Sequence, residues 1–145
     1  DWLNKGYNCF LIRHPAKVIN SYIKKNTLIS IDDIGFKKQY EIFNMLKKDK
    51  IKYMVVNADT ILQDPSKTLK KLCKILKIRF NKKMLSWPKG RRPSDGIWST
   101  VWYRNVELSN TFSKYKKEKY YVPKKYNDIY EESLKYYNIM NQYSI

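Results

Sequence analysis

The sequence YNCFLIRHPAKVINS, residues 7–21, decides the fold of this chain. Its first half is a short apolar run that ends at the charged Arg13, a pattern typical of a buried strand. His14 and Pro15 interrupt that run, and we expect a helix to begin here because proline is favoured in the first helical turn. The apolar residues of that helix fall on one face: Val18, Ile19, Tyr22 and Ile23. The stretch therefore predicts a strand followed directly by an amphipathic helix.

A second strand-like run covers residues 52–57. A stretch with helical spacing separates this run from the first strand. It begins at a cap, either Ser30 or Asp32, and continues to Lys50. Strands joined through such helices predict a parallel crossover unit, which places the fold in the α/β class. The rest of the chain is expected to hold a helix opening at Asp64 and Pro65, an irregular stretch over residues 84–93, a helix over residues 97–115 and a final helix over residues 127–142.

Length and composition bound the class of protein. The 145 residues fit one domain, and 43% hydrophobic residues are enough for a folded core. No apolar run approaches the roughly 18 residues of a membrane span. Cys9 and Cys73 lie in apolar patterns and are expected to be reduced core residues, which indicates a cytoplasmic protein. Two distant cysteines and a single histidine are too few ligands for a structural zinc site, so no metal is expected.

The net charge of +17 is what a polyanion-binding protein would show. However, 25 of the 30 basic residues are lysine, and lysine, asparagine, isoleucine and tyrosine are abundant together, as an AT-rich coding sequence would give. The tyrosines are scattered and lack clustered arginine, which disfavours nucleic acid as the partner. A bland basic surface and a basic module for RNA or another polyanion both stay open as interpretations.

Arg13 is the first candidate binding residue, because ligands of open α/β sheets bind at the carboxyl ends of strands. Its guanidinium is always charged and suits a phosphate. Ser21 follows eight residues later, about two helical turns on, so its hydroxyl can reach the same anion. The alternative is that Arg13 ends a strand in solvent and Ser21 is an ordinary helix-surface residue.

A second candidate anion site is the basic loop that contains Lys89, Gly90 and Arg92, because a glycine lets the backbone approach a phosphate closely. A solvated loop is the alternative interpretation. Trp87, Trp98, Trp102 and Tyr103 form an aromatic set that could line a substrate pocket or stack on adenine. The alternative is core packing, because Trp98 and Trp102 share one face of the expected helix over residues 97–115.

Three stretches resemble the sulfotransferases that use 3'-phosphoadenosine 5'-phosphosulfate (PAPS). Residues 10–21 are similar to the strand, loop and helix in which that family holds the 3'-phosphate, with Arg13 and Ser21 in the matching places. Residues 53–76 are similar to a later strand and leucine-rich helix, with Asp59 in the acidic place. Residues 84–103 resemble a bacterial branch, some members of which carry branched-chain aminotransferase-like labels.

The resemblance covers roughly residues 5–112 and implies a P-loop NTPase-like, three-layer parallel sheet with flanking helices. Residues 1–145 would form a single domain that holds only the carboxyl-terminal portion of that fold. The family's first strand, its 5'-phosphosulfate loop and its catalytic Lys and His are expected before Asp1, so no catalytic residue is assigned within the chain. His14 follows the strand and is expected to be a loop or capping residue rather than the base.

The implied function is transfer of a sulfuryl group from PAPS to a hydroxyl or amine acceptor. The acceptor would be a small molecule or another hydroxyl or amine compound, and the reaction would need no metal. Lys89, Gly90 and Arg92 would correspond to the family's late loop that closes over the 3'-phosphate, although Gly90 and Gly96 are spaced differently here. The alternatives are the polyanion-binding module and a non-catalytic remnant of the sulfotransferase fold. An aminotransferase is disfavoured, because no lysine stands in a recognisable pyridoxal-phosphate setting.

Overall fold

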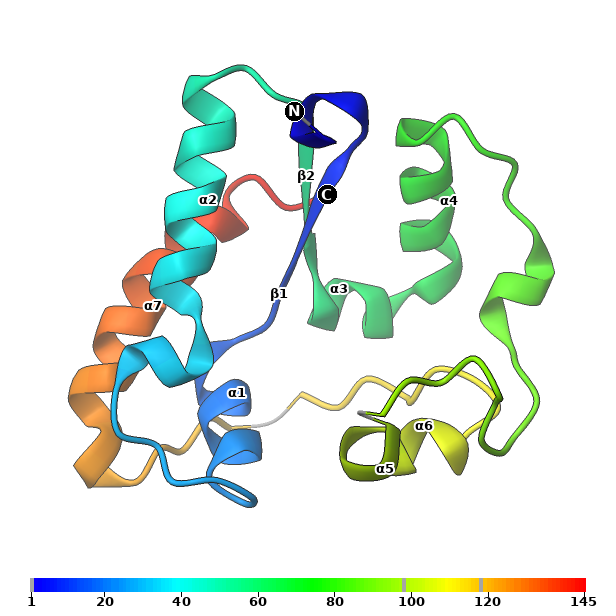
Figure 1. Cartoon of the computed structure of the whole chain (residues 1–145). Coiled ribbons are helices and arrows are strands. Elements are labelled where there is room, and N and C mark those ends of the chain that lie inside the picture. The colour runs from blue at the N-terminus through cyan, green and yellow to red at the C-terminus, as the bar shows by residue number, and fades with distance from the viewer. Residues whose placement is uncertain (1, 98, 118) are drawn as a thin grey trace. The chain divides into compact units, whose positions relative to one another are not determined.

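The computed structural model describes residues 2–97, 99–117 and 119–145. The chain divides into two compact units (Figure 1). Unit 1 consists of residues 1–59 and 117–145, and unit 2 consists of residues 60–116. Each unit is described by itself.

The two expected strands form the sheet of unit 1. β1 (Asn8–Ile12) and β2 (Tyr53–Asn57) pair in parallel, with Asn8 opposite Tyr53 and Ile12 opposite Asn57. The end of the chain lies along β2, where the Ile145 N–H donates to the Val55 carbonyl oxygen at 3.1 Å. The α/β class is confirmed, and the sheet has two strands among the described residues. The three-layer P-loop arrangement stays a prediction.

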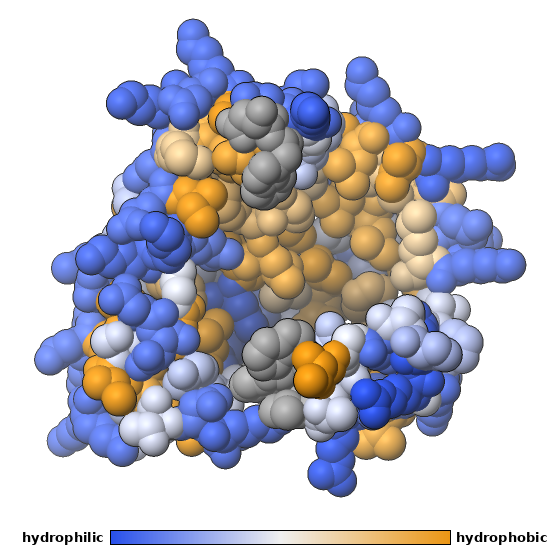
Figure 2. Space-filling view, viewed as in Figure 1, coloured by the Kyte–Doolittle hydropathy of each residue, from blue (hydrophilic) through white to orange (hydrophobic). Residues whose placement is uncertain are grey.

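β1 is buried on one face only, which corrects the expectation of a wholly buried strand. Phe10 and Ile12 are buried, whereas Cys9 is exposed and Leu11 is 58% exposed. Figure 2 shows hydrophobic surface where the strands lie. The prediction that Cys9 is a core residue is therefore wrong, because strand side chains alternate between faces and helices of unit 1 cover just one of them. Cys73 is buried as predicted.

Helices of unit 1 follow the predicted order with one break. α1 (Pro15–Tyr22) follows β1, and the connection to β2 contains a short 3-10 helix, η2 (Ile31–Ile34), and α2 (Phe36–Lys48). Ser30 caps η2 as expected, but the prediction of a single helix from Ser30 to Lys50 is wrong. Gly35 separates the two helices because its φ of 69° lies in the left-handed region that favours glycine.

The core of unit 1 lies between the sheet, α2 and the final helix α7 (Asn127–Asn141). α7 agrees with the predicted final helix. Phe43 of α2 is fully buried and meets Phe10 of β1 edge to face, with ring centroids 5.9 Å apart. Val55 and Met140 complete the contact between β2 and α7. Side chains from distant parts of the chain therefore fix the two strand ends from which the candidate site is built.

Unit 2 differs more from the sequence expectation. The chain enters it through α3 (Ala58–Gln63), a short helix that was not predicted, and continues in α4 (Pro65–Ile75), which Asp64 caps as expected. The predicted helix over residues 97–115 is wrong. Two four-residue helices, α5 (Ser99–Trp102) and α6 (Arg104–Glu107), lie in that range, and an antiparallel bridge joins Ser86 to Thr111.

Three short 3-10 helices complete the description: η1 (Trp2–Lys5), η3 (Lys82–Leu85) and η4 (Lys124–Tyr126). No helix in the described part of the chain combines the length and apolar character needed to cross a membrane. Within that same part, the acidic, histidine and cysteine side chains form no cluster of three or more suited to a metal ion.

Candidate functional site

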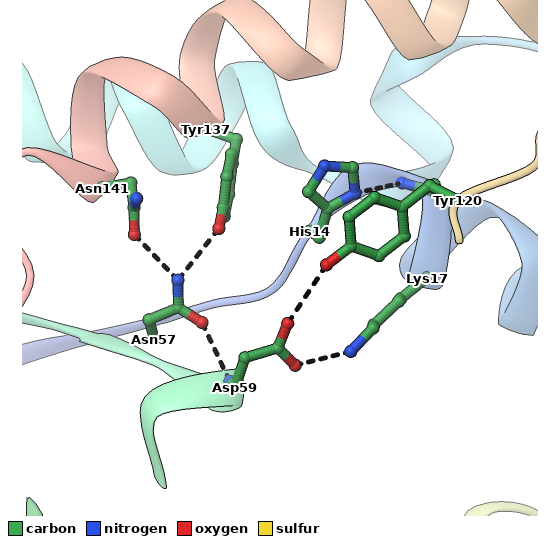
Figure 3. A network of polar contacts seen from close by, with 8 residues as sticks. His14, Lys17, Asn57, Asp59, Tyr120, Tyr137 and Asn141 are labelled. Carbon is green, nitrogen blue, oxygen red and sulfur yellow. Dashed lines mark hydrogen bonds and ion pairs between the residues drawn. The ribbon is translucent and has the colours of Figure 1, made fainter. Parts of the chain in front are cut away.

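A polar network lies at the carboxyl ends of the two strands of unit 1 (Figure 3). Because β1 and β2 are parallel, the residues that follow them emerge at the same edge of the sheet. Arg13 follows β1 directly, and Lys17 stands in α1, which begins two residues later. Asp59 stands in α3, two residues after β2 ends. This edge is where open α/β sheets bind their ligands.

An ion pair between Lys17 and Asp59 forms the centre of the network. Lys17 Nζ lies 2.8 Å from Asp59 Oδ1, and the two side chains are only 10% and 12% exposed. The Tyr120 hydroxyl donates to the other oxygen of Asp59 at 3.4 Å. Desolvation disfavours the charge on Lys17, but the hydrogen bond and the charge of Asp59 outweigh it, so the pKa of Lys17 is raised. Asp59 thus holds the Lys17 ammonium in place.

Asn57, the last residue of β2, ties this network to α7. Its Nδ2 donates to the Tyr137 hydroxyl at 2.9 Å and to Asn141 Oδ1 at 2.8 Å. Its Oδ1 accepts from the Asp59 N–H at 2.9 Å. The Asn57 side chain is buried, so these hydrogen bonds satisfy polar groups that would be costly to leave without a partner. Asn57 therefore fixes the backbone from which Asp59 projects.

His14 caps α1 and stacks on a tyrosine of the returning chain. Its Nδ1 accepts from the Ala16 N–H at 3.3 Å. Its ring lies 3.6 Å from that of Tyr120, with the two planes 8° apart. Desolvation lowers the pKa of His14, so the neutral ring that accepts the capping hydrogen bond is favoured. This arrangement agrees with the interpretation of His14 as a capping residue.

Arg13 is exposed and has no hydrogen-bond or ion-pair partner within residues 2–97, 99–117 and 119–145. It is close enough to Lys17 for its charge to oppose protonation of that ammonium. It also lines a hollow of about 310 Å³ beside α2, whose other lining residues are Leu11, Val18, Ile34, Gly35, Phe36 and Gln39. Ser21 is exposed in the last turn of α1 and does not line this hollow.

Unit 2 contains a larger hollow, of about 470 Å³. A loop that starts at Trp87 and the segment around α6 enclose it. The Trp87 N–H donates to the Asn110 carbonyl at 2.9 Å, and its indole N–H donates to Ser109 Oγ at 3.2 Å. The Gly90 N–H donates to the Glu107 carbonyl at 2.8 Å. These bonds join two segments that are about twenty residues apart in the sequence.

The second predicted anion loop belongs to unit 2, whereas Arg13 and Ser21 belong to unit 1. Gly90 and Arg92 line the hollow of unit 2, and Lys89 is exposed beside them without lining it. Gly90 has a φ of 103°, which explains the need for glycine. However, its N–H is already bonded to Glu107, so an anion here would be held by the Lys89 and Arg92 side chains.

The aromatic lining of that hollow overlaps with the predicted aromatic set. Trp87 and Tyr103 of that set line it, together with Phe112. Trp98 lies outside the described residues, as does the side chain of Trp102. Sequence spacing gives no signal for Phe112, because it meets Trp87 through the antiparallel bridge and not along one helix.

Comparison with known proteins gives a family and two distant relatives. A family model described as a sulfotransferase domain matches residues 1–144. The chain is 33% identical over 143 residues to branched-chain-amino-acid aminotransferase-like protein 1 of Arabidopsis thaliana. It is 31% identical over 140 residues to branched-chain-amino-acid aminotransferase-like protein 2 of the same organism. The matches cover 99% and 97% of the chain but only 26% and 25% of the relatives. No solved structure gives a significant match.

Proposed function

Because the chain belongs to the sulfotransferase domain family, we propose that residues 1–145 form a single domain that binds PAPS for transfer of its sulfuryl group to a hydroxyl or amine acceptor. The chain spans about a quarter of the length of the curated relatives it matches. No residue of this chain is proposed as catalytic. The groups that would bind the phosphosulfate end and act as general base are not proposed among these 145 residues.

The observation that carries this proposal is the setting of Arg13. Its guanidinium stands at the carboxyl end of β1 with no anionic partner in the described part of the chain. Lys17 beside it is already paired with Asp59, so Arg13 adds an uncompensated positive charge to this edge of the sheet. A doubly charged phosphate accepts a fork of two N–H groups and relieves that charge. We assign the 3'-phosphate of the donor to Arg13.

Ser21, Lys89 and Arg92 are the further proposed donor contacts, and Gly90 shapes the loop that carries the last two. Ser21 lies on the helix that begins beside Arg13, and its hydroxyl would donate to the same phosphate. Lys89 and Arg92 would supply cations from the loop that Gly90 turns. The hydrogen bond from Gly90 to Glu107 holds that loop in shape, which reduces the entropy lost when an anion binds.

The proposed chemistry needs positioning and charge rather than a metal. The sulfur–oxygen bond to the donor phosphate breaks and a new one to the acceptor oxygen or nitrogen forms, while the acceptor proton leaves to a base. The negative charge develops on the 5'-phosphate of the leaving group, where fixed cations would stabilise it, whereas Arg13 on the 3'-phosphate would anchor and position the donor. The relatives' aminotransferase-like names do not lead us to propose that activity, because the family model describes a sulfotransferase domain.

The test is a calorimetric titration of the 145-residue chain with adenosine 3',5'-bisphosphate and with 5'-AMP at moderate salt. We expect the bisphosphate to bind more tightly, because 5'-AMP lacks the 3'-phosphate. Arg13→Ala should weaken bisphosphate binding by about 1.5–3 kcal/mol, the range for a hydrogen bond to a charged group. It should leave 5'-AMP binding nearly unchanged.

Arg79→Ala is the matched control, because Arg79 is an equally exposed arginine of unit 2 that lies outside the proposed contacts. Equal weakening by the two variants, with a steep fall of affinity in salt, would identify a general polyanion surface instead. Unchanged bisphosphate affinity in Arg13→Ala would remove Arg13 from the site.

A further inference from the structure

We propose that the hollow of unit 2 binds a flat, largely apolar ligand that carries a protonated amine, and that Glu107 pairs with this amine. The inference names a class of acceptor and in that respect rests on the proposed sulfuryl transfer. Binding itself does not depend on the donor, so it is measured without one.

The size and lining of the hollow suit a small organic molecule. Its volume of about 470 Å³ lies within the range of roughly 300–1,000 Å³ that is usual for ligand pockets. Trp87 and Phe112 meet edge to face, with ring centroids 5.3 Å apart, and Tyr103 and Val106 are half-exposed beside them. Apolar rings of this kind contact a flat ligand through their faces.

The charged residues of the lining favour a ligand with a positive charge. Two carboxylates, Asp95 and Glu107, line the hollow beside one guanidinium, that of Arg92. This excess of negative charge is local, since the whole chain has 13 acidic and 30 basic residues. An anion inside the hollow would be repelled by both carboxylates. An ammonium group would be attracted by the carboxylates and by the faces of the aromatic rings.

Of the two carboxylates, Glu107 is the one left for a ligand. Asp95 Oδ2 already accepts the Arg92 N–H at 2.9 Å, which closes the turn between these residues. The Glu107 side chain has no ion pair within the described part of the chain, although the residue is half-buried. Its backbone carbonyl is held by the Gly90 N–H, so its position is fixed before a ligand arrives.

The experiment compares three phenyl ligands of similar size and different charge: 2-phenylethylamine, 2-phenylethanol and 3-phenylpropionate. Each is titrated into the chain by calorimetry without any donor. We expect the amine to bind most tightly and the carboxylate most weakly. Glu107→Gln should weaken binding of the amine roughly ten- to a hundredfold, the range for loss of a hydrogen bond to a charged group, and leave the alcohol within about twofold.

Glu131→Gln is the matched control, because Glu131 is exposed on α7 of unit 1 and is not among the lining residues, and the substitution removes the same charge. Equal affinities for the amine and the alcohol, or an unchanged amine affinity in a folded Glu107→Gln chain, would overturn the proposal. If that variant fails to fold, the order of the three ligands on the unaltered chain decides. Arg13→Ala should not affect amine binding, so a failure here is distinguishable from a failure of the donor site.

Discussion

Lys17 Nζ lies 2.8 Å from Asp59 Oδ1, and this ion pair links the helix after β1 to the helix after β2. Sheet pairing already fixes the register of the two strands. The ion pair extends that constraint past the strand ends, to the residues beside Arg13 that the proposed donor site uses.

Asp59→Asn should lower the free energy of unfolding by about 1–3 kcal/mol, between the values for exposed and fully buried ion pairs. The variant removes the carboxylate charge that faces the Lys17 ammonium in a largely buried position. Urea unfolding followed by circular dichroism measures the change. Glu41→Gln is the control, because its pair with Lys38 is exposed, with a distance of 3.2 Å, and should change stability by less than about 0.5 kcal/mol. A loss of bisphosphate affinity at unchanged stability would contradict this structural role.

Stability should fall when the pH is lowered below about 6.5, the ordinary pKa of histidine. Desolvation lowers the pKa of His14 in the folded chain, so the unfolded chain takes up a proton first and is favoured as the pH decreases. His14 is the only histidine of the sequence, which makes the assignment direct. Unfolding free energies between pH 5 and pH 7.5 measure the effect. His14→Asn keeps a capping side chain and should flatten this part of the profile, and an unaltered slope would assign it to other groups.

Asn57→Ala should destabilise the chain by about 2–4 kcal/mol, because three hydrogen bonds of a buried side chain are lost. Tyr137→Phe removes one of those bonds and should cost about 1 kcal/mol. Denaturant unfolding of both variants gives the comparison. Equal effects would mean that the amide does not act as the shared centre of the three contacts.

Gly35→Ala should cost about 1 kcal/mol of stability, since a side chain at a φ of 69° is strained. No atom lies within 4 Å of the position that a Cβ would take at Gly35, so the cost is purely conformational. Gly6→Ala has equally open surroundings without a positive φ and should change stability little. Thermal unfolding of the pair tests whether the break between η2 and α2 depends on backbone conformation.

Much of unit 1 could be predicted from the sequence because its signals are local. The apolar run before Arg13, the proline after it and the helical spacing of residues 127–142 correspond to β1, α1 and α7. The break at Gly35 was missed because hydrophobic spacing continues across it. The exposure of Leu11 was missed because an apolar run alone does not tell which faces are covered.

Unit 2 was predicted less well because nonlocal contacts determine it. Residues 97–115 have helical spacing, yet the bridge from Ser86 to Thr111 and the bond from Gly90 to Glu107 hold the segment in another path. The placement of Arg13 at a strand end followed from the sequence. The meeting of Trp87, Phe112 and Glu107 around one hollow did not, because no periodicity relates them.

The hydrogen bond from Ile145 to Val55 gives the sheet of unit 1 two unequal edges. β2 pairs with β1 along one side, and on its other side residues 144–145 contact it at Val55. The outer side of β1 is also partly engaged, because Gln39 Nε2 donates to the Leu11 carbonyl at 3.2 Å. A backbone that adds to this sheet would therefore compete with the end of the chain beside β2 or with a side chain beside β1.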